Sequence, residues 1–468
     1  MTMQRRQLNR ALGLAALGAG LGGCSTPATQ QPLAEAGAAP AQVPAPVVSA
    51  TPVPTGAAPP ASAPAAPVPA PAQEFRGVWV ATVANIDWPS RTGLPAARQR
   101  AEALAILDKA VALGLNAVIL QVRSAGDAIY PSALEPWAEC LTGTQGRAPD
   151  DGYDPLAFWL AQAHQRGLAL HAWFNPYRAR HSTARSPAAA SHLSQRRPDL
   201  VKPYGDQQWI DPGEPDAATH TLAVVADVLK RYAVDGVHID DYFYPYPVPT
   251  SKDEGAPDVP FPDQAAWGRY MAGGGILARD DWRRANVNQL VRDLFALVRR
   301  ERPAALLGIS PFGIGQPAQR PLGIQGFSQY HKLYADVELW CAQGWMDYLA
   351  PQLYWPIDQA PQAFAVLLDY WLAQVPDGVA VWPGLFSSRV GQAPKPWPAD
   401  EVLRQIALVR ERSAREVSPG NPAPEPSGHI HFSMAALMQD RDGLATRLRA
   451  GPYARSARRP AREPGRPQ

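Results

Sequence analysis

The sequence has few features that would point to nucleic acid, to a bound cofactor or to a membrane-spanning fold. Lysines and arginines number 44 and aspartates and glutamates 42, so the net charge of +2 provides no electrostatic basis for binding nucleic acid. The apolar run near the N-terminus, residues 11–21, is too short to cross a bilayer. We find no P-loop, no Cys-x-x-Cys pair and no nucleophile elbow, and we therefore expect no cofactor and no nucleic-acid partner.

Cysteine is also scarce, with three in 468 residues. Cys24 ends the N-terminal apolar segment. Cys140 and Cys341 could form one disulfide in an oxidising compartment, but Cys140 falls in a predicted loop and Cys341 in a predicted helix. Two free, buried thiols are therefore an equally good interpretation.

The first 24 residues are typical of an export signal. Arg5 and Arg6 precede the apolar run, which ends in Leu-Gly-Gly-Cys at residues 21–24. This ending is typical of a bacterial lipobox, which would make the lipidated Cys24 the first residue of the mature protein. A plain secretory signal with a chance cysteine is the alternative, and the arginine pair also resembles a twin-arginine signal. We expect a lipoprotein of the cell envelope, attached to the outer membrane through Cys24 and facing the periplasm.

Two further segments have compositions that do not favour folding. Residues 25–73 are mostly alanine and proline, without a single aromatic residue. Such a segment is expected to be a disordered tether that reaches about 150 Å at most. The Arg-rich C-terminal residues 451–468 are expected to be a disordered basic tail.

Between residues 74 and 450 a strand followed by a helix repeats eight times. The predicted strands cover residues 76–83, 116–123, 168–175, 234–245, 306–312, 348–355, 380–386 and 428–434. The predicted helices cover residues 97–113, 155–166, 219–233, 283–301, 331–344, 361–374, 400–412 and 436–449.

This alternation predicts an α/β fold with a parallel sheet, closed into a (β/α)8 TIM barrel. An open doubly wound sheet is the alternative, which the absence of a glycine-rich phosphate turn after the first strand disfavours. The long loops, 124–154, 176–218, 243–282 and 313–330, all follow strands. They should therefore gather at the C-terminal face, where barrel enzymes have their active sites.

The fourth strand carries the most informative residues. Side chains alternate along a strand, so His238, Asp240 and Tyr242 should share its inner face. Polar groups on the inside of a buried strand are costly unless they are paired or needed. A carboxylate at the end of a barrel strand is typical of catalysis, and Asp240 is our first catalytic candidate. The alternative is that Asp240 only caps the next segment or binds an arginine.

Several long blocks stand out along the chain: residues 76–79, 85–90, 121–123 with 125–132, 171–178, 235–245, 309–313 and 350–355. Together these blocks resemble the glycosyl-hydrolase-like family ten. The resemblance extends over about residues 74–435. It implies a (β/α)8 barrel and a bacterial envelope glycosidase that acts on the glycan strands of peptidoglycan.

The fourth strand also resembles the Asp-Gly-x-Asp-x-Asp-x-Glu signature of family-eighteen chitinases. Asp235, Gly236 and Asp240 match it, but His238 replaces an aspartate and Tyr242 stands where the acid glutamate should be. The proton donor must therefore be another residue, or the mechanism must differ. We consider Asp241 first, although strand alternation points it toward the helices, and then Asp127 and Asp87.

Residues around the expected site are suited to binding a sugar. Amide, phenol and guanidinium groups bind hydroxyl, acetamide and carboxylate groups, and aromatic rings stack on sugar faces. The substrate-binding candidates are Trp88, Arg123, Asn175, Tyr177, Arg178, His238, Tyr242, Gln352, Tyr354 and Trp355, with Trp173 as a further ring. His429 and His431 should point into the barrel interior, and no third metal ligand has suitable spacing.

We therefore expect a glycoside hydrolase that cleaves cell-wall glycan, with Asp240, Asp241 and Asp127 as the catalytic candidates. Asp240 is our candidate for stabilising the oxocarbenium-like centre of that reaction. A non-catalytic glycan-binding lipoprotein is the alternative, because the acid residue is not obvious. A hydrolase of an α-glucan or an exopolysaccharide is a third interpretation.

Overall fold

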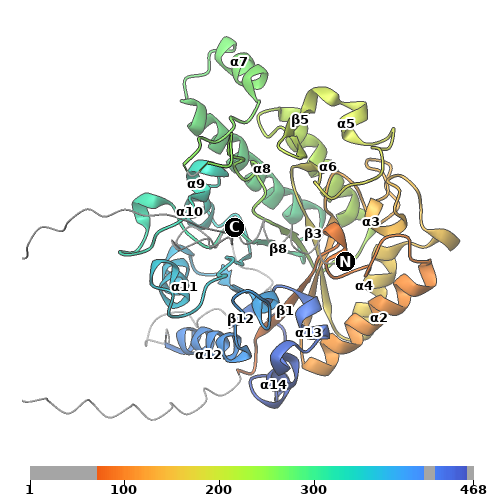
Figure 1. Ribbon diagram of the computed structural model, residues 1–468, viewed down its shortest axis with the longest axis vertical. Helices are drawn as coiled ribbons and strands as arrows, with labels where there is room; N and C mark the ends of the chain where they lie inside the picture. Colours follow the sequence, from red (N-terminus) through yellow and green to blue (C-terminus); the bar gives the residue numbers. More distant parts are fainter. Residues whose placement is uncertain (1–70, 254, 416–426, 461–468) are drawn as a thin grey trace, which may run out of the picture.

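The computed structural model describes residues 71–253, 255–415 and 427–460 (Figure 1). The predicted signal peptide, Cys24 and nearly all of the predicted tether lie outside the described residues. Within them, no helix is long and apolar enough to cross a membrane.

A parallel sheet of nine strands forms the centre of the molecule. Its order is β10-β9-β8-β7-β3-β2-β1-β12-β11. The strands are β1 (Phe75–Val80), β2 (Ala117–Arg123), β3 (Ala169–Phe174), β7 (Gly236–Ile239), β8 (Leu306–Ile309), β9 (Tyr348–Leu349), β10 (Ala380–Val381), β11 (Gly384–Leu385) and β12 (Gly428–His431). The predicted α/β fold with a parallel sheet is confirmed, and each predicted strand overlaps at least one of these. The predicted seventh strand is divided into β10 and β11, which stand at the two ends of the order although only Trp382 and Pro383 separate them.

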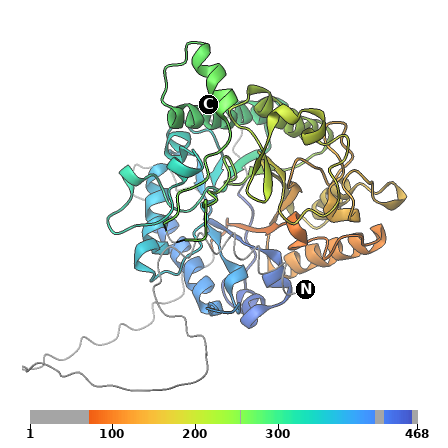
Figure 2. The same cartoon turned by 45° about the horizontal axis from the view of Figure 1, so that its top comes forward.

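Helices surround this sheet in sequence order, and Figure 2 shows them running round the strands from orange (α2) to blue (α14). They are α2 (Ala96–Leu113), α3 (Glu139–Thr142), α4 (Pro155–Gln165), α5 (Leu193–Arg196), α6 (Pro215–Arg231), α7 (Gln264–Ala272), α8 (Arg279–Glu301), α9 (Gln329–Lys332), α10 (Val337–Ala342), α11 (Phe364–Gln374), α12 (Ala399–Arg415), α13 (Met434–Met438) and α14 (Leu444–Ala450). The predicted helices 331–344 and 436–449 are each split in two, as α9 with α10 and α13 with α14. Helix α2 ends at Gly114, whose φ of 79° is the left-handed conformation that glycine adopts most easily.

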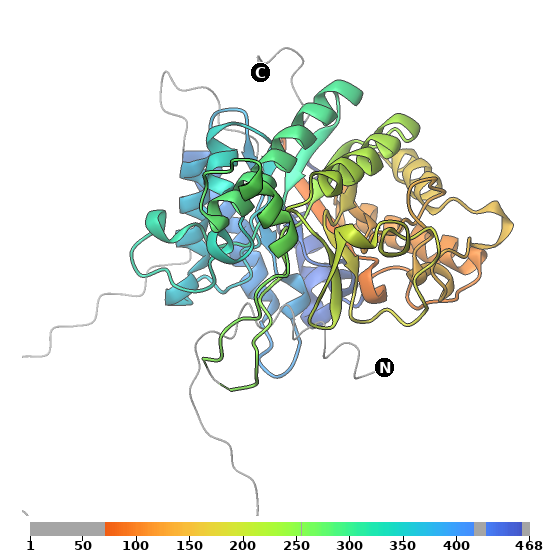
Figure 3. The same cartoon turned by 90° about the horizontal axis from the view of Figure 1, so that it is seen from above.

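The loop after β3 contains a small sheet that the sequence did not predict. Its antiparallel strands are β4 (Arg178–Arg180), β5 (Val201–Tyr204) and β6 (Gln207–Ile210), in the order β4-β6-β5. The segment between β7 and α7 extends from the body of the molecule in Figure 3. Both insertions follow strands of the main sheet, as expected for the face that carries the site.

The inside of the curled sheet is filled by large rings that face small residues. Phe75 stacks on Trp382 with ring centroids 3.9 Å apart, and Tyr348 lies beside both rings. A Cβ atom on Gly308 would lie only 1.9 Å from Cζ of Tyr348, so only glycine fits there. The opposite strand faces carry Val78, Leu120, Val237 and other aliphatic residues against the helices.

The prediction that His429 and His431 fill the interior is wrong. Gly428 and Ile430 face inward, and the two histidines point to the helix side, where both bond the hydroxyl of Tyr453. The period of two predicted correctly that the histidines share a face, but it does not say which face is inside.

The expected disordered tail at 451–468 needs correction for residues 451–460, and residues 461–468 lie outside the described residues. Residues 451–460 pack beneath the start of β1, where Arg458 forms a parallel bridge with Gln73 and Arg76 Nη1 donates to the carbonyl of Arg455 at 2.9 Å. Tyr453 is only 4% exposed. The single aromatic ring in this segment therefore anchors it, which the arginine content of the segment does not reveal.

Cys140 and Cys341 are buried and free, in α3 and α10. This outcome agrees with the interpretation of two buried thiols.

Candidate functional site

Two adjacent carboxylates lie just beyond the end of β7. The side chain of Asp240 accepts hydrogen bonds on Oδ2 from Trp173 Nε1 at 2.9 Å and from Asn175 Nδ2 at 3.3 Å, while its buried Oδ1 has no partner. Asp241 accepts hydrogen bonds from the hydroxyl of Tyr246 and from the side chain of Gln352. Strand alternation pointed Asp241 toward the helices, but β7 already ends at Ile239, so both carboxylates face the same region.

Burial dominates the protonation of this pair. It raises the pKa of Asp240 from 3.8 to about 7, while the guanidinium of Arg178 lowers that pKa and Asp241 raises it. Burial likewise raises the pKa of Asp241, and the hydrogen bonds from Tyr246 and Gln352 lower it. A carboxyl group that titrates near neutral pH is suited to transferring protons.

Arg178 supplies a positive charge beside the pair. Its guanidinium lies 4.1 Å from the centre of the Tyr242 ring, and Nη1 donates to the carbonyl of Ser124 at 3.4 Å. Asn175 Oδ1 accepts the backbone N–H of Arg178 at 2.8 Å, so one asparagine positions both Asp240 and Arg178.

Arg178 differs from the other buried arginines of the described residues. Five of these have a carboxylate within ion-pair distance: Arg76, Arg123, Arg283, Arg284 and Arg410. Arg178 has none in the described part of the chain, and its Nε lacks any hydrogen-bond partner. A buried charge without a counter-ion is costly, which marks this region as functional.

His238 lies deeper in the curled sheet and is fully buried. Trp79 Nε1 donates to His238 Nε2 at 3.1 Å, so the proton of the neutral ring resides on Nδ1, which bonds the hydroxyl of Tyr348 at 2.9 Å. That hydroxyl can then donate to His171 Nδ1 at 2.9 Å. Burial lowers the pKa of His238 well below its ordinary value. Both ring nitrogens are engaged, so His238 supports the site from below and is not placed to contact a substrate.

Several other candidates are buried away from the pair. Trp88 is 0% exposed, packs edge-on against Trp159 and donates to the carbonyl of Gln99 at 3.0 Å. Tyr177 is also fully buried. Trp355 packs edge-on against Phe312, with ring centroids 5.6 Å apart.

Arg123 pairs with Glu135 at 2.6 Å and donates to the carbonyl of Asn175 at 2.5 Å, so it braces the segment that carries Asn175.

The two alternative acids are already engaged. Asp127 accepts bonds from the backbone N–H of Ala125 at 3.2 Å and from Gln145 at 3.4 Å, and burial raises its pKa to about 6. Asp87 accepts bonds from Ser433 Oγ at 2.8 Å and the backbone N–H of Ala435 at 2.7 Å, and burial raises its pKa to about 6. Asp127 and Asp87 therefore each hold a loop in place. Asp241 remains the acidic neighbour of Asp240.

The structure brings together Asp240, Asp241, Asn175, Arg178, Tyr242 and Gln352. Sequence reasoning missed Tyr246, which bonds Asp241, and two half-buried rings, Phe386 and Phe432, which lie beside Tyr354. Their position in the sequence could have identified the two phenylalanines, because Phe386 directly follows β11 and Phe432 directly follows β12.

The described residues contain no group of three or more histidine, cysteine, aspartate or glutamate side chains that could hold a metal ion.

Comparison with known proteins gives consistent results. The family model described as "Glycosyl hydrolase-like 10" matches residues 74–399. The chain is 38% identical to the glycosyl hydrolase YngK of Bacillus subtilis over 82% of this chain and 73% of the relative. It is 34% identical to the glycosyl hydrolase DigH of Escherichia coli over 77% of this chain and 83% of the relative.

Among solved structures, the chain is similar to the PgaB glycoside hydrolase domain from Bordetella bronchiseptica. The TM-score is 0.49 and the identity 15%, over 80% of this chain and 98% of that domain. The family model covers more than half of the chain, and the curated relatives cover most of it. The chain belongs to the glycosyl hydrolase-like 10 family.

Proposed function

We propose that this protein cleaves the glycan strands of the bacterial cell wall. Family membership supports a glycosidase-type function, and the finer proposal concerns the substrate and the residues. The observation that carries it is the acidic pair at the end of β7, in which Asp240 has one unpartnered oxygen and a pKa raised by burial to about 7.

The environments of the two carboxyl groups suggest different roles. Asp240, with its raised pKa and unpartnered Oδ1, is suited to protonate the leaving glycosidic oxygen. The side chain of Asp241 is held by hydrogen bonds from Tyr246 and Gln352, which lower its pKa against the effect of burial, so Asp241 is the candidate for stabilising the oxocarbenium-like centre. The sequence suggests that stabilising role for Asp240, but its unpartnered Oδ1 is the reason for assigning it the proton.

The finer fold assignment is also a proposal: the curled sheet is a (β/α)8 barrel whose seventh strand is interrupted at Trp382 and Pro383. Backbone hydrogen bonds on both sides of this strand support it. Trp382 donates to the carbonyl of Leu349 at 2.8 Å, and Pro383 accepts from the N–H of Ile430 at 3.0 Å. Residues 380–385 therefore bond to both neighbouring strands, and the carboxylate pair lies at the C-terminal face of the barrel.

The location remains a proposal as well. The lipobox at residues 21–24 supports lipidation of Cys24 and attachment to the outer membrane, facing the periplasm. Incorporation of a radiolabelled fatty acid in wild type, and its absence in Cys24→Ala, would test this.

The hydrolase is tested by incubating the purified protein with peptidoglycan and with isolated glycan strands, and measuring released reducing ends. Products should form with wild type and disappear in Asp240→Asn. Asp127→Asn is the matched control, because it removes another buried carboxyl with a raised pKa and should retain activity.

A non-catalytic glycan-binding protein is the second candidate. It is favoured by Tyr242 in the place of a carboxyl group and by the low exposure of Asp240 and Asp241, 3% and 2%. Glycan that is retained by the wild-type protein without release of reducing ends would support it.

A further inference from the structure

Three half-buried aromatic side chains lie together at the ends of neighbouring strands. Tyr354 stacks on Phe386 with ring centroids 4.7 Å apart, and Phe432 lies 5.7 Å from Tyr354 and 6.4 Å from Phe386. We refer to Tyr354, Phe386 and Phe432 as the aromatic platform. All three are partly exposed, in contrast to the fully buried Phe75 and Tyr348 inside the sheet. Phenylalanine has no polar group, so its exposure at a strand end is not explained by solvation of its side chain.

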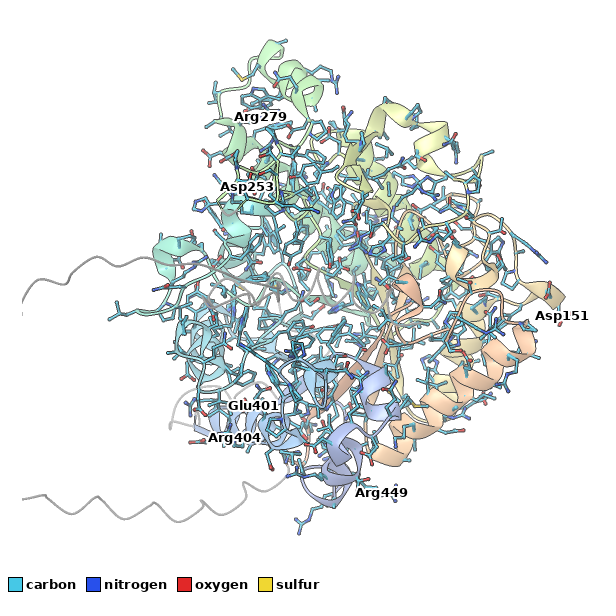
Figure 4. The ribbon with its side chains drawn as sticks, viewed as in Figure 1. Asp151, Asp253, Arg279, Glu401, Arg404 and Arg449 are labelled. Carbon is cyan, nitrogen blue, oxygen red and sulfur yellow. The ribbon has the colours of Figure 1, made fainter. Side chains whose placement is uncertain are left out.

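The backbone under this platform is held in place from the helix layer. Gln405 of α12 donates to the carbonyl of Trp355 at 3.1 Å, and Glu401 accepts the backbone N–H of Ile357 at 2.8 Å. Figure 4 shows Glu401 beside Arg404, which pairs with it at 2.5 Å. Phe432 donates its backbone N–H to the carbonyl of Leu385 at 2.9 Å. The rings are therefore presented by a fixed backbone, as a binding surface requires.

The platform is continuous with the carboxylate pair. Gln352, two residues before Tyr354, bonds Asp241. On the other side, the ring centroids of Trp79 and Phe432 are 6.1 Å apart. Trp79 also donates a hydrogen bond to His238, which lies beneath Asp240. Gly384 leaves no side chain between them, since a Cβ atom there would lie 3.0 Å from Trp79 and 3.3 Å from Tyr354.

The sheet order places the platform across from the acidic pair. Asp240 and Asp241 follow β7, whereas Tyr354 follows β9 and the two phenylalanines follow β11 and β12. A chain-like ligand lying on the platform would therefore extend over the strand ends toward the carboxylates.

We propose that the aromatic platform is a sugar-binding subsite that stacks on the apolar face of a pyranose ring, remote from the bond cleaved at Asp240 and Asp241. This inference rests on the proposed function, because it identifies the bound ligand as the same glycan strand. Flat rings without competing polar groups are suited to the C–H face of a sugar. A subsite away from the cleaved bond contributes to binding of long strands and not of short fragments.

The test measures binding in full-length protein that carries Asp240→Asn, so that the glycan is bound but not cut. The ligands are a disaccharide and an octasaccharide prepared from cell-wall glycan, and binding is followed by tryptophan fluorescence and by calorimetry. Phe386→Ala and Tyr354→Ala should each weaken octasaccharide binding by about tenfold, as expected for one lost stacked ring, and leave disaccharide binding unchanged. Phe386→Leu keeps an apolar side chain but has no flat ring, and it should weaken octasaccharide binding as Phe386→Ala does. Because leucine preserves the packing, weaker binding in this variant would not result from unfolding.

Phe295→Ala is the matched control, because this half-buried ring lies on α8 beneath Arg299. It should leave binding of both ligands unchanged. If folded Phe386→Leu and Tyr354→Ala bind the octasaccharide as tightly as the parent protein does, the proposed subsite is wrong. If instead the platform variants weaken binding but wild type releases no reducing ends, the subsite holds and the proposed hydrolysis fails.

Discussion

At the end of the sheet where the strands begin, the buried guanidinium groups of Arg76 and Arg410 both bind the carboxylate of Glu74, at 2.6 and 2.7 Å. At the opposite end, the buried Arg178 lies beside Asp240 and Asp241 without an ion pair, and one oxygen of Asp240 has no partner. The buried guanidinium groups thus form ion pairs with a carboxylate at one end of the sheet, whereas Arg178 forms none at the other. Pairing a buried charge serves stability, whereas leaving it unpaired costs stability and is retained where a ligand or a proton transfer needs it.

The largest effect should come from Asp240→Asn. Loss of the proton donor should lower kcat by about 10²–10⁴-fold on glycan strands. The melting temperature should not fall, because the substitution removes a buried carboxyl whose ionisation is unfavourable. Reducing-end assays measure kcat, and thermal unfolding measures the melting temperature. Retained activity would contradict the role of Asp240, and a large loss of stability would show that its importance is structural.

Glu74→Gln should lower stability and leave activity unchanged, which is the opposite of the outcome expected for Asp240→Asn. It leaves two buried guanidinium groups without their counter-charge and should lower the free energy of unfolding by about 3–5 kcal/mol. Activity per folded molecule should be unchanged, because Glu74 lies at the far end of the sheet. Denaturant unfolding measures this, with the exposed Asp400→Asn, which breaks a surface pair with Arg447, as a control expected to cost less than about 1 kcal/mol.

The pH profile provides a third test. Asp240 must be protonated to act as an acid, and its pKa in the folded protein is raised to about 7. Activity should therefore be present below pH 7 and decline as the pH rises through 7. A profile of kcat/KM that rises through this range would mean that Asp240 acts in its ionised form.

Arg178→Met should move that profile. The guanidinium lowers the pKa of both Asp240 and Asp241, so its removal should raise both and shift the decline to higher pH by about one unit. Arg178→Lys, which keeps the charge, should shift it less. A lower rate with an unmoved profile would indicate that Arg178 acts only through packing on Tyr242.

The smallest effect should come from Tyr453→Phe at the paired end. This substitution removes the hydroxyl that both His429 and His431 bond and should cost about 1–3 kcal/mol of unfolding free energy. Activity should not change. A loss of activity would mean that the two ends of the sheet are coupled.

The order of the strands and helices could be predicted from sequence because it depends on local patterns. Alternating apolar residues and helix-ending glycines gave all eight strands of the repeat, and the acidic end of the fourth strand pointed to Asp240. The small β4-β6-β5 sheet was missed because its strands are three or four residues long and are defined only by pairing with each other.

The errors about individual side chains have a common cause. Periodicity assigns residues to the same face, but the choice of face and the point where a strand ends depend on tertiary packing. His429 and His431 therefore pointed outward instead of inward, and Asp241 joined Asp240 because β7 ends at Ile239. Trp88 was proposed to stack on sugar, but it packs on Trp159 in the core. The paired partner of Arg123, Glu135, likewise could not be identified without the fold.

The bridge between Gln73 and Arg458 brings the first and last described parts of the chain side by side at the end of the sheet opposite the carboxylates. Surface immobilisation or fusion of another protein near either of these residues should consequently leave the face that carries Asp240 and Asp241 accessible. The same adjacency makes the region suitable for circular permutation, since a short linker would span the gap.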